Sequence, residues 1–164
     1  MGDSTYTALF LCTGNSARSI MAEAIMNASG RGRVTAYSAG SHPTGQVHPL
    51  ALATLRDMGM PSDGLRSKSW DEFAVPGAPP LDFVFTVCDK AAGEACPFWP
   101  GQPITAHWGV EDPAAFAGPD DRKRQMFRDV AVILRRRIEL FLSLPLESQE
   151  HLSLQQKLSE IGKN

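Results

Sequence analysis

The sequence passes from the apolar run YTALFL at 6–11 directly into CTGNSARS at 12–19, which carries Cys12 and Arg18. The apolar run predicts a short strand that is buried on both faces. A strand that leads through small residues into a helix gathers backbone N–H groups and the positive helix end around one point, which favours phosphate-like anions. We therefore predict an oxyanion-binding loop. Its expected residues are Thr13, Gly14, Asn15, Ser16, Ala17, Arg18 and Ser19.

Cys12 is the expected nucleophile at the base of this loop. The loop amides, the helix dipole and Arg18 all favour a thiolate, so we expect a lowered pKa for the Cys12 thiol. Arg18 is expected to bind two anion oxygens, and Ser19 to cap the helix and donate its hydroxyl to the sulfur. The alternative is that Cys12 is a small buried hydrophobic residue. The left-handed conformations accessible to Gly14 and Asn15 favour the anion loop.

The composition is that of one soluble globular domain. The 164 residues are 43% hydrophobic and 21% charged, which suffices for a hydrophobic core. With a net charge of −2 and neither a leader nor a membrane-spanning run, we expect a cytoplasmic monomer that binds neither nucleic acid nor membranes. Three cysteines without ligand-like spacing predict neither a fixed disulfide framework nor a metal site.

Predicted strands and helices alternate along the chain. Strands are expected at 7–11, 34–39, 83–87 and 104–108, and helices at 20–28, 48–58 and 120–142, with a short turn at 69–73. This alternation predicts an α/β fold of three small layers, in which helices flank a four-stranded parallel sheet. The domain is expected to span 1–146, with 147–164 as a helical or disordered extension. The three arginines at 135–137 are interpreted as a solvated helix face.

Two further cysteines form a second cluster. Ligands of parallel sheets bind beyond the carboxyl ends of the strands, so Cys12 and Cys88, which each follow a strand, are expected at the same edge. Cys96 lies too far from Cys88 to pair with it on one helix, and a disulfide between them requires the segment to loop out. The alternative is that Cys88 fills the end of a buried strand and Cys96 is a stray exposed thiol.

An acidic residue follows the fourth predicted strand at the same edge. Asp112 is held in an extended conformation by the proline after it, and it is the candidate general acid for an oxygen that leaves the bound anion. Glu111 is the competing candidate, and the sequence does not separate the two.

Several stretches between residues 7 and 142 share the pattern of one known family: Cys12–Ser19, Ser38-Ala39-Gly40, His48-Pro49, Arg66-Ser67-Lys68, Val87-Cys88-Asp89 through Cys96-Pro97, and His107-Trp108-Gly109 with Asp112-Pro113. They resemble the arsenate reductases built on the low-molecular-weight protein tyrosine phosphatase fold. The anion loop alone fits phosphatases and reductases, whereas the cysteine pair and the His-Trp-Gly segment are typical of the reductases.

The resemblance implies a relay of three cysteines. Cys12 attacks arsenate while Asp112 protonates the departing oxygen, and Cys88 then attacks the Cys12 sulfur and releases arsenite. Cys96 next attacks Cys88, which frees Cys12 and leaves a disulfide for an external dithiol. The resemblance implies no tightly bound cofactor and a thiol reductant, either thioredoxin or glutaredoxin with glutathione.

Two other functions stay open. A phosphatase acting on phosphotyrosine or small phosphoesters typically has a second cysteine where this chain has Ala17, and an aromatic residue where it has Ala114. A redox or oxyanion sensor would use the same thiols without turnover. Some members of the arsenate reductase family that this chain resembles also hold a potassium ion beneath the loop. The matching positions here are Asn15, Glu23 and Ser38.

Overall fold

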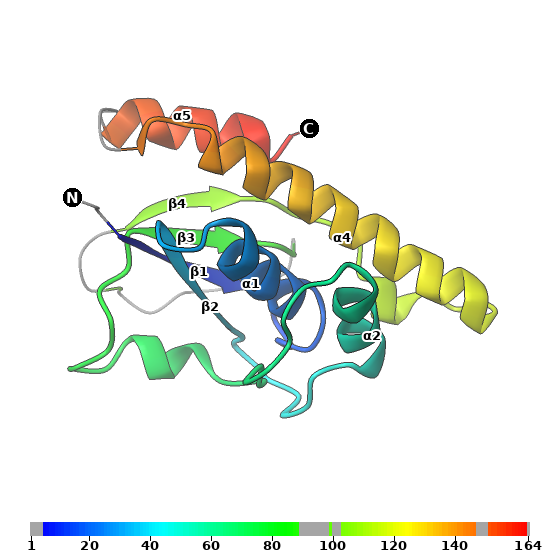
Figure 1. The fold of residues 1–164 in the computed structure, drawn as a ribbon. Coiled ribbons are helices and arrows are strands. Elements are labelled where there is room, and N and C mark those ends of the chain that lie inside the picture. The colour runs from blue at the N-terminus through cyan, green and yellow to red at the C-terminus, as the bar shows by residue number, and fades with distance from the viewer. Residues whose placement is uncertain (1–4, 89–98, 100–102, 147–150, 164) are drawn as a thin grey trace.

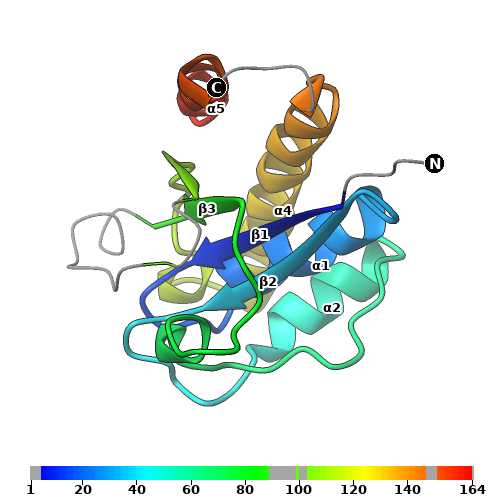
Figure 2. The same ribbon diagram turned by 90° about the vertical axis from the view of Figure 1, so that its left-hand side faces the viewer.

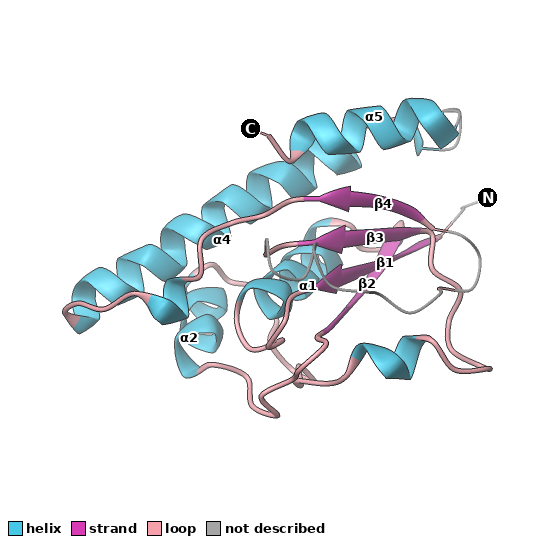
Figure 3. Ribbon diagram, turned by 180° about the vertical axis from the view of Figure 1, so that it is seen from behind, coloured by secondary structure: helices cyan, strands magenta, loops and turns pink. Residues whose placement is uncertain are grey.

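The fold was obtained as a computed structural model, which describes residues 5–88, 99, 103–146 and 151–163 (Figure 1). The described strands form a parallel sheet in the order β2-β1-β3-β4, with β1 at Tyr6–Leu11, β2 at Val34–Ala39, β3 at Phe83–Thr86 and β4 at Ile104–His107. Leu11 pairs with Ala39 and Thr86, and the arrows of β1, β3 and β4 point the same way in Figure 3. The strands therefore end at one edge, where Cys12 and Cys88 follow β1 and β3.

Helices and loops cover both faces of this sheet. The helices are α1 at Arg18–Ser29, α2 at Pro49–Asp57, α4 at Asp120–Leu142 and α5 at His151–Ile161, with short 3-10 helices η1 at Trp70–Phe73 and η2 at Pro113–Ala115. Figure 2 shows α1 and α4 on one side of the sheet, where Phe10 and Phe85 stack at 5.2 Å between ring centroids. On the other face, Leu9 and Val84 pack with Phe73 and Trp99. The expected α/β class is confirmed.

The C-terminal helix α5 packs beside β4. Leu154 and Leu158 are buried in the main core, and the Leu158 carbonyl accepts a hydrogen bond of 2.9 Å from the Trp108 indole. Of the two states expected for the C-terminal extension, residues 151–161 adopt the helical one, whereas the boundary after residue 146 stays a prediction. Within the described ranges, no helix combines the length and apolarity that crossing a membrane requires.

Arg137 corrects the interpretation of the arginine run. Arg135 and Arg136 are exposed, but Arg137 is only 7% exposed, and its guanidinium donates to the carbonyls of Trp108 and Gly109 at 3.0 and 3.1 Å. The reason is helical periodicity: Arg137 follows Val130 by seven residues and therefore lies on the buried stripe of α4. The prediction of a solvated face is wrong for this residue.

Candidate active site

In the loop between β1 and α1, backbone amides face the inside of the loop. The loop carbonyls point the other way, because they accept hydrogen bonds from a neighbouring segment of the chain. The carbonyls of Thr13, Gly14 and Ser16 accept hydrogen bonds of 2.9, 3.0 and 2.9 Å from the backbone amides of His42, Thr44 and His48. A trans peptide directs its N–H opposite to its carbonyl, so the amides of Gly14, Asn15 and Ala17 face the other side. The Gly14 amide acts on Cys12, where it lowers the pKa of the thiol. This arrangement suits an oxyanion above Cys12.

Asn15 fixes the bend of the loop. Its φ of 46° is left-handed, as the sequence led us to expect, and its side chain is fully buried. The amide nitrogen of that side chain donates to Ser19 Oγ at 2.8 Å and Ser38 Oγ at 3.0 Å, and its oxygen accepts from the Lys68 backbone amide at 2.9 Å. These three hydrogen bonds offset the strain of the left-handed conformation.

Gly40 lies directly against the backbone of the same loop. A Cβ at this position would stand 2.5 Å from the Thr13 carbonyl oxygen and 2.6 Å from the Cys12 carbonyl oxygen. The close approach explains why a residue without a side chain follows β2 here.

Ser19 corrects one expectation. The helix α1 begins at Arg18 with Ala17 as its N-cap residue, and no side chain of the described residues caps it. Ser19 therefore lies inside the first turn, where its hydroxyl accepts from Asn15 and does not cap the helix. The loop enters the helix earlier than the sequence indicated. Donation from Ser19 to the Cys12 sulfur stays a prediction.

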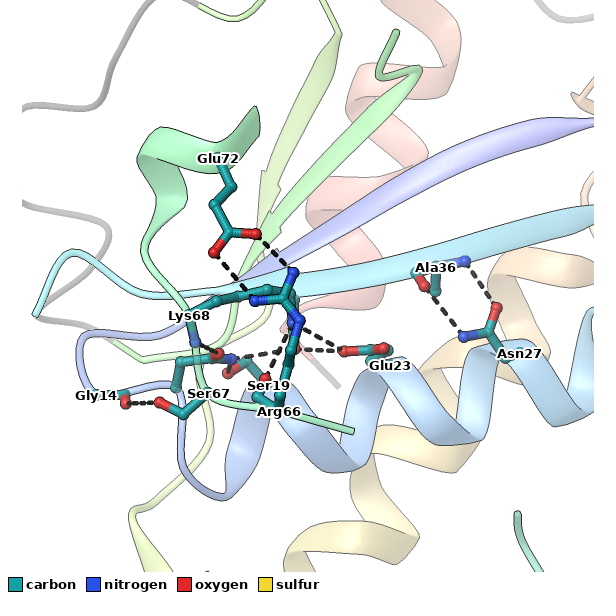
Figure 4. Close-up of polar contacts among 11 residues, drawn as sticks. Gly14, Ser19, Glu23, Asn27, Ala36, Arg66, Ser67, Lys68 and Glu72 are labelled. Atoms are coloured by element: carbon teal, nitrogen blue, oxygen red, sulfur yellow. Dashed lines mark hydrogen bonds and ion pairs between the residues drawn. The ribbon is translucent and has the colours of Figure 1, made fainter. Parts of the chain in front are cut away.

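A buried ion pair lies behind the loop (Figure 4). Ser38 donates to Glu23 Oε1 at 2.5 Å, and the same carboxylate oxygen lies 3.8 Å from the Lys68 ammonium, which also donates to the Arg66 carbonyl at 3.0 Å. Burial raises the pKa of Glu23, opposed by Ser38 and Lys68, and burial lowers the pKa of Lys68. Because an ammonium already compensates this carboxylate, the residues do not fit a potassium ion in the same place.

Lys68 is a functional candidate that the sequence reasoning missed. In the sequence it belongs to the stretch Arg66-Ser67-Lys68 that resembles the family, and the resemblance implies no role for it. Its position beside Glu23 depends on a contact between distant segments, which no local pattern reveals. Together with Arg66 and Glu72 it lines a cavity of about 410 Å³.

Cys12 and Cys88 meet at the edge of the sheet, as expected. Both thiols are buried and free of a disulfide, and they are close enough for Cys88 to affect the pKa of the Cys12 thiol. The Cys88 sulfur also lies 3.7 Å from Thr13 Oγ1. Cys96 falls outside the described residues, so its place in the site stays a prediction.

The pKa of Cys12 contradicts the expected direction. The neighbouring Cys88 side chain and burial raise the pKa of the Cys12 thiol, against the lowering effects of Arg18 and the Gly14 amide. The expected direction rests on the loop and Arg18 alone, whereas the neighbouring thiol and the burial of Cys12 outweigh both. A proton must therefore leave this thiol pair before or during any attack by Cys12.

Arg18 connects the anion loop to the predicted acid. Its guanidinium donates to the Val110 carbonyl at 3.1 Å and lies 3.6 Å from the Asp112 carboxylate. Asp112 is 41% exposed in its side chain and accepts from the Ala114 amide at 3.0 Å. Glu111 instead lines a cavity against α4. The geometry therefore favours Asp112 over Glu111 as the acid that faces a bound anion.

The described residues contain no group of three or more His, Cys, Asp or Glu side chains that could hold a metal ion. The chemistry available at this edge is therefore that of two adjacent thiols, a guanidinium, a carboxyl group and a cup of backbone amides. Such a site suits nucleophilic attack by sulfur on a tetrahedral oxyanion.

Comparison with known proteins identifies the family. The family model described as low molecular weight phosphotyrosine protein phosphatase matches residues 7–157. The chain belongs to this family.

Within the family, the chain is similar to proteins named as arsenate reductases, which confirms the resemblance inferred from the sequence. An arsenate reductase of Halalkalibacterium halodurans is 36% identical over 132 residues, covering 80% of this chain and 91% of the relative. A glutaredoxin arsenate reductase of Synechocystis sp. is 30% identical over 131 residues, covering 80% and 92%. The structure of a thioredoxin-dependent arsenate reductase of Corynebacterium glutamicum matches with a TM-score of 0.63 at 26% identity, covering 90% of this chain and 66% of that one.

Proposed function

We propose that this protein reduces arsenate to arsenite through a relay of Cys12, Cys88 and Cys96, as a means of arsenic detoxification. The observation that carries the proposal is a pair of buried thiols free of a disulfide, Cys12 and Cys88, which interact at the base of the anion loop, with the Cys88 sulfur 3.7 Å from Thr13 Oγ1. A phosphatase needs one nucleophile and has no step for a second thiol, whereas a two-electron reduction needs both. The names of the relatives support the same reaction.

In the first step, the loop amides and Arg18 hold arsenate above Cys12. The Cys12 sulfur bonds to arsenic, and one arsenate oxygen leaves as water with a proton from Asp112. Cys88 then attacks the Cys12 sulfur, and the electron pair of the sulfur–arsenic bond passes to arsenic. Arsenite leaves, and Cys12 and Cys88 are oxidised to a disulfide.

In the second half of the relay, Cys96 attacks Cys88 and frees Cys12. The resulting disulfide between Cys88 and Cys96 is reduced by an external dithiol. We propose thioredoxin for this role, with glutaredoxin and glutathione as the second candidate, because relatives of both kinds match this chain. We accordingly propose a cytoplasmic reaction, because thioredoxin and glutathione keep thiols reduced in that compartment.

The reaction is tested by arsenate-dependent oxidation of NADPH, coupled in turn to thioredoxin with its reductase and to glutaredoxin with glutathione. We expect turnover with at least one couple and none in Cys12→Ser. The absence of turnover with both couples would refute arsenate reduction. Rapid hydrolysis of aryl phosphates that does not depend on Cys88 would then favour the phosphatase.

The relay is tested separately with Cys96→Ser. We expect one turnover of arsenate, followed by arrest with a Cys12 to Cys88 disulfide that peptide mass mapping detects. Slow hydrolysis of an aryl phosphate by the same variant is the matched control, since it uses the anion loop but no disulfide. Undiminished multiple turnover of arsenate in Cys96→Ser would refute the three-thiol relay.

A further inference from the structure

The chain that leads from β4 to the acid, residues 108–112, is held by two arginines from different elements. We call these residues the acid segment. Arg137 of α4 donates to the carbonyls of Trp108 and Gly109, at 3.0 and 3.1 Å. Arg18 of α1 donates to the next carbonyl, Val110, and lies beside Asp112. Consecutive carbonyls of the acid segment thus point to two guanidinium groups.

The other contacts fix the start of the acid segment. The Trp108 indole stacks on Phe85 with 4.0 Å between ring centroids, and the Trp108 amide donates to Thr86 at 2.7 Å. The Val110 amide donates to Val87, the residue before Cys88, at 3.1 Å. Farther along the segment, Arg18 contacts the Val110 carbonyl and the Asp112 carboxylate, whereas the guanidinium of Arg137 acts at Trp108 and Gly109, where the segment leaves the core.

Burial of the charged Arg137 guanidinium in the core is energetically unfavourable. It shares the buried stripe of α4 with Leu134 and Phe141, and burial lowers the pKa of its guanidinium, with a further contribution from Arg136. Even buried ion pairs can often be replaced by apolar residues of similar volume without loss of stability. What an apolar residue would not supply is a donor that fixes two neighbouring carbonyls in one orientation.

We propose that Arg137 is a positioning residue for the acid step: by holding the carbonyls of Trp108 and Gly109, it sets the direction from which Asp112 meets the bound anion. This rests on the proposed function, because it assigns Asp112 the role of proton donor to arsenate. Arg137 contacts the backbone carbonyls of the acid segment and acts through them. Its removal should therefore impair proton donation and leave oxyanion binding intact.

The first test is a double-mutant cycle of Arg137→Gln and Asp112→Asn, measured as single-turnover loss of two thiols per arsenate. We expect Arg137→Gln alone to slow the reaction about ten- to hundredfold, as expected for a displaced catalytic group. In the Asp112→Asn background it should slow the reaction less than twofold further, because the acid through which it acts is gone. Additive losses would overturn the proposal. The matched control is Arg136→Gln, an exposed neighbour on the same helix.

Chemical rescue provides a second test. A cavity of about 360 Å³ is lined by Arg137, Gly109 and Val110, among others, and lies next to the position of this side chain. In Arg137→Ala, guanidinium chloride at tens of millimolar should restore single-turnover reduction at least severalfold, while leaving wild type and Arg136→Ala unchanged. Arg137→Lys, which keeps a charged donor, should fall between Arg137→Gln and wild type. Equal losses in the Lys and Gln variants without rescue would contradict positioning by hydrogen bonds.

Amide hydrogen exchange separates this proposal from the proposed function. If the wild type loses no thiols with arsenate, the proposed arsenate reduction is refuted. The positioning role of Arg137 is then tested by the exchange protection of residues 109–112 alone. Arg137→Gln should lower this protection at least fivefold in the phosphate-bound protein, and Arg136→Gln should not. Unchanged protection in Arg137→Gln would overturn the positioning role, whatever the substrate.

Discussion

The Lys68 ammonium lies 3.8 Å from the Glu23 carboxylate, and both side chains are largely buried behind the loop that carries Cys12. From Glu23 the contacts run through Ser38 to Asn15, and the Asn15 side chain accepts from the backbone amide of Lys68. The contacts therefore close into a ring. Because Asn15 makes the left-handed bend of the anion loop, the ion pair supports the shape of the loop without touching an anion.

Lys68→Met should destabilise the fold by about 3 kcal/mol, because it leaves the buried Glu23 charge without its ammonium. Urea unfolding measures the loss. Adding Glu23→Gln to Lys68→Met should recover more than about 1 kcal/mol, since the uncompensated carboxylate is then removed. The control is Arg66→Gln, which breaks the exposed pair of Arg66 with Glu72 and should cost less than about 1 kcal/mol. Equal losses of stability in Lys68→Met and in Lys68→Met/Glu23→Gln would contradict the coupling between the two charges.

Cys88→Ala should lower the pKa of the Cys12 thiol. The interaction with the Cys88 side chain is the largest cause that raises this pKa, and its removal leaves the lowering effects of Arg18 and the Gly14 amide less opposed. The pH dependence of Cys12 alkylation by iodoacetamide measures the change, in Cys88→Ala/Cys96→Ala against Cys96→Ala alone. The midpoint should move to lower pH. A midpoint that stays or rises would show that Cys88 does not control the protonation of Cys12.

Asp112→Asn should slow the first chemical step about 10²- to 10⁴-fold, the range of general acid catalysis. Phosphate binding should tighten severalfold in the same variant, because the carboxylate 3.6 Å from Arg18 no longer competes with a bound dianion. Single-turnover kinetics and calorimetric titration with phosphate measure the two effects. Glu111→Gln is the matched control and should change neither. An equal slowing in Glu111→Gln would transfer the acid role to Glu111.

His48 should make stability depend on pH near neutrality. Its Nδ1 accepts from the Leu50 amide at 3.1 Å and caps α2, while burial, followed by Lys123, lowers the pKa of His48 from 6.5. This contribution is present above pH 6.5 and is lost as the pH falls through the lower pKa of the folded state, because the protonated ring cannot accept the hydrogen bond.

The measurement is urea unfolding of wild type and His48→Asn between pH 7.5 and 5. Asn also caps helices but does not titrate, so the wild type should lose about 1 kcal/mol relative to the variant over this range. Parallel pH profiles of the two proteins would contradict the assignment.

The regular elements were accessible from the sequence because their signals are local. The continuous apolar stripe of α4 predicted its bounds at residues 120 and 142, and the short apolar runs placed the strands to within one residue at either end. The meeting of Cys12 and Cys88 also followed, because parallel strands deliver their carboxyl ends to one edge.

What escaped the sequence depends on contacts between distant segments. Arg137 sits within a run of three arginines, and its hydrogen-bonding partners, Trp108 and Gly109, lie on another element. Its spacing from Val130 and Phe141 was the signal that could have revealed its burial. Lys68 gave no comparable signal, since its distance from Glu23 is set only when the segment between α2 and η1 folds back towards α1. The predicted direction of the Cys12 pKa was wrong because the effect of Cys88 depends on a contact between the two residues that the sequence does not show.

The helix α5 limits the access of other molecules to the backbone of the outer strand β4. An outer strand such as β4 normally presents unpaired backbone groups to which another chain adds a strand, a common route to aggregation. Here Gln155 donates to the Thr105 carbonyl, and a Cβ at Gly162 would collide with the His107 carbonyl, so the helix rests directly on that backbone. A second copy that extended the sheet at β4 would first have to displace α5.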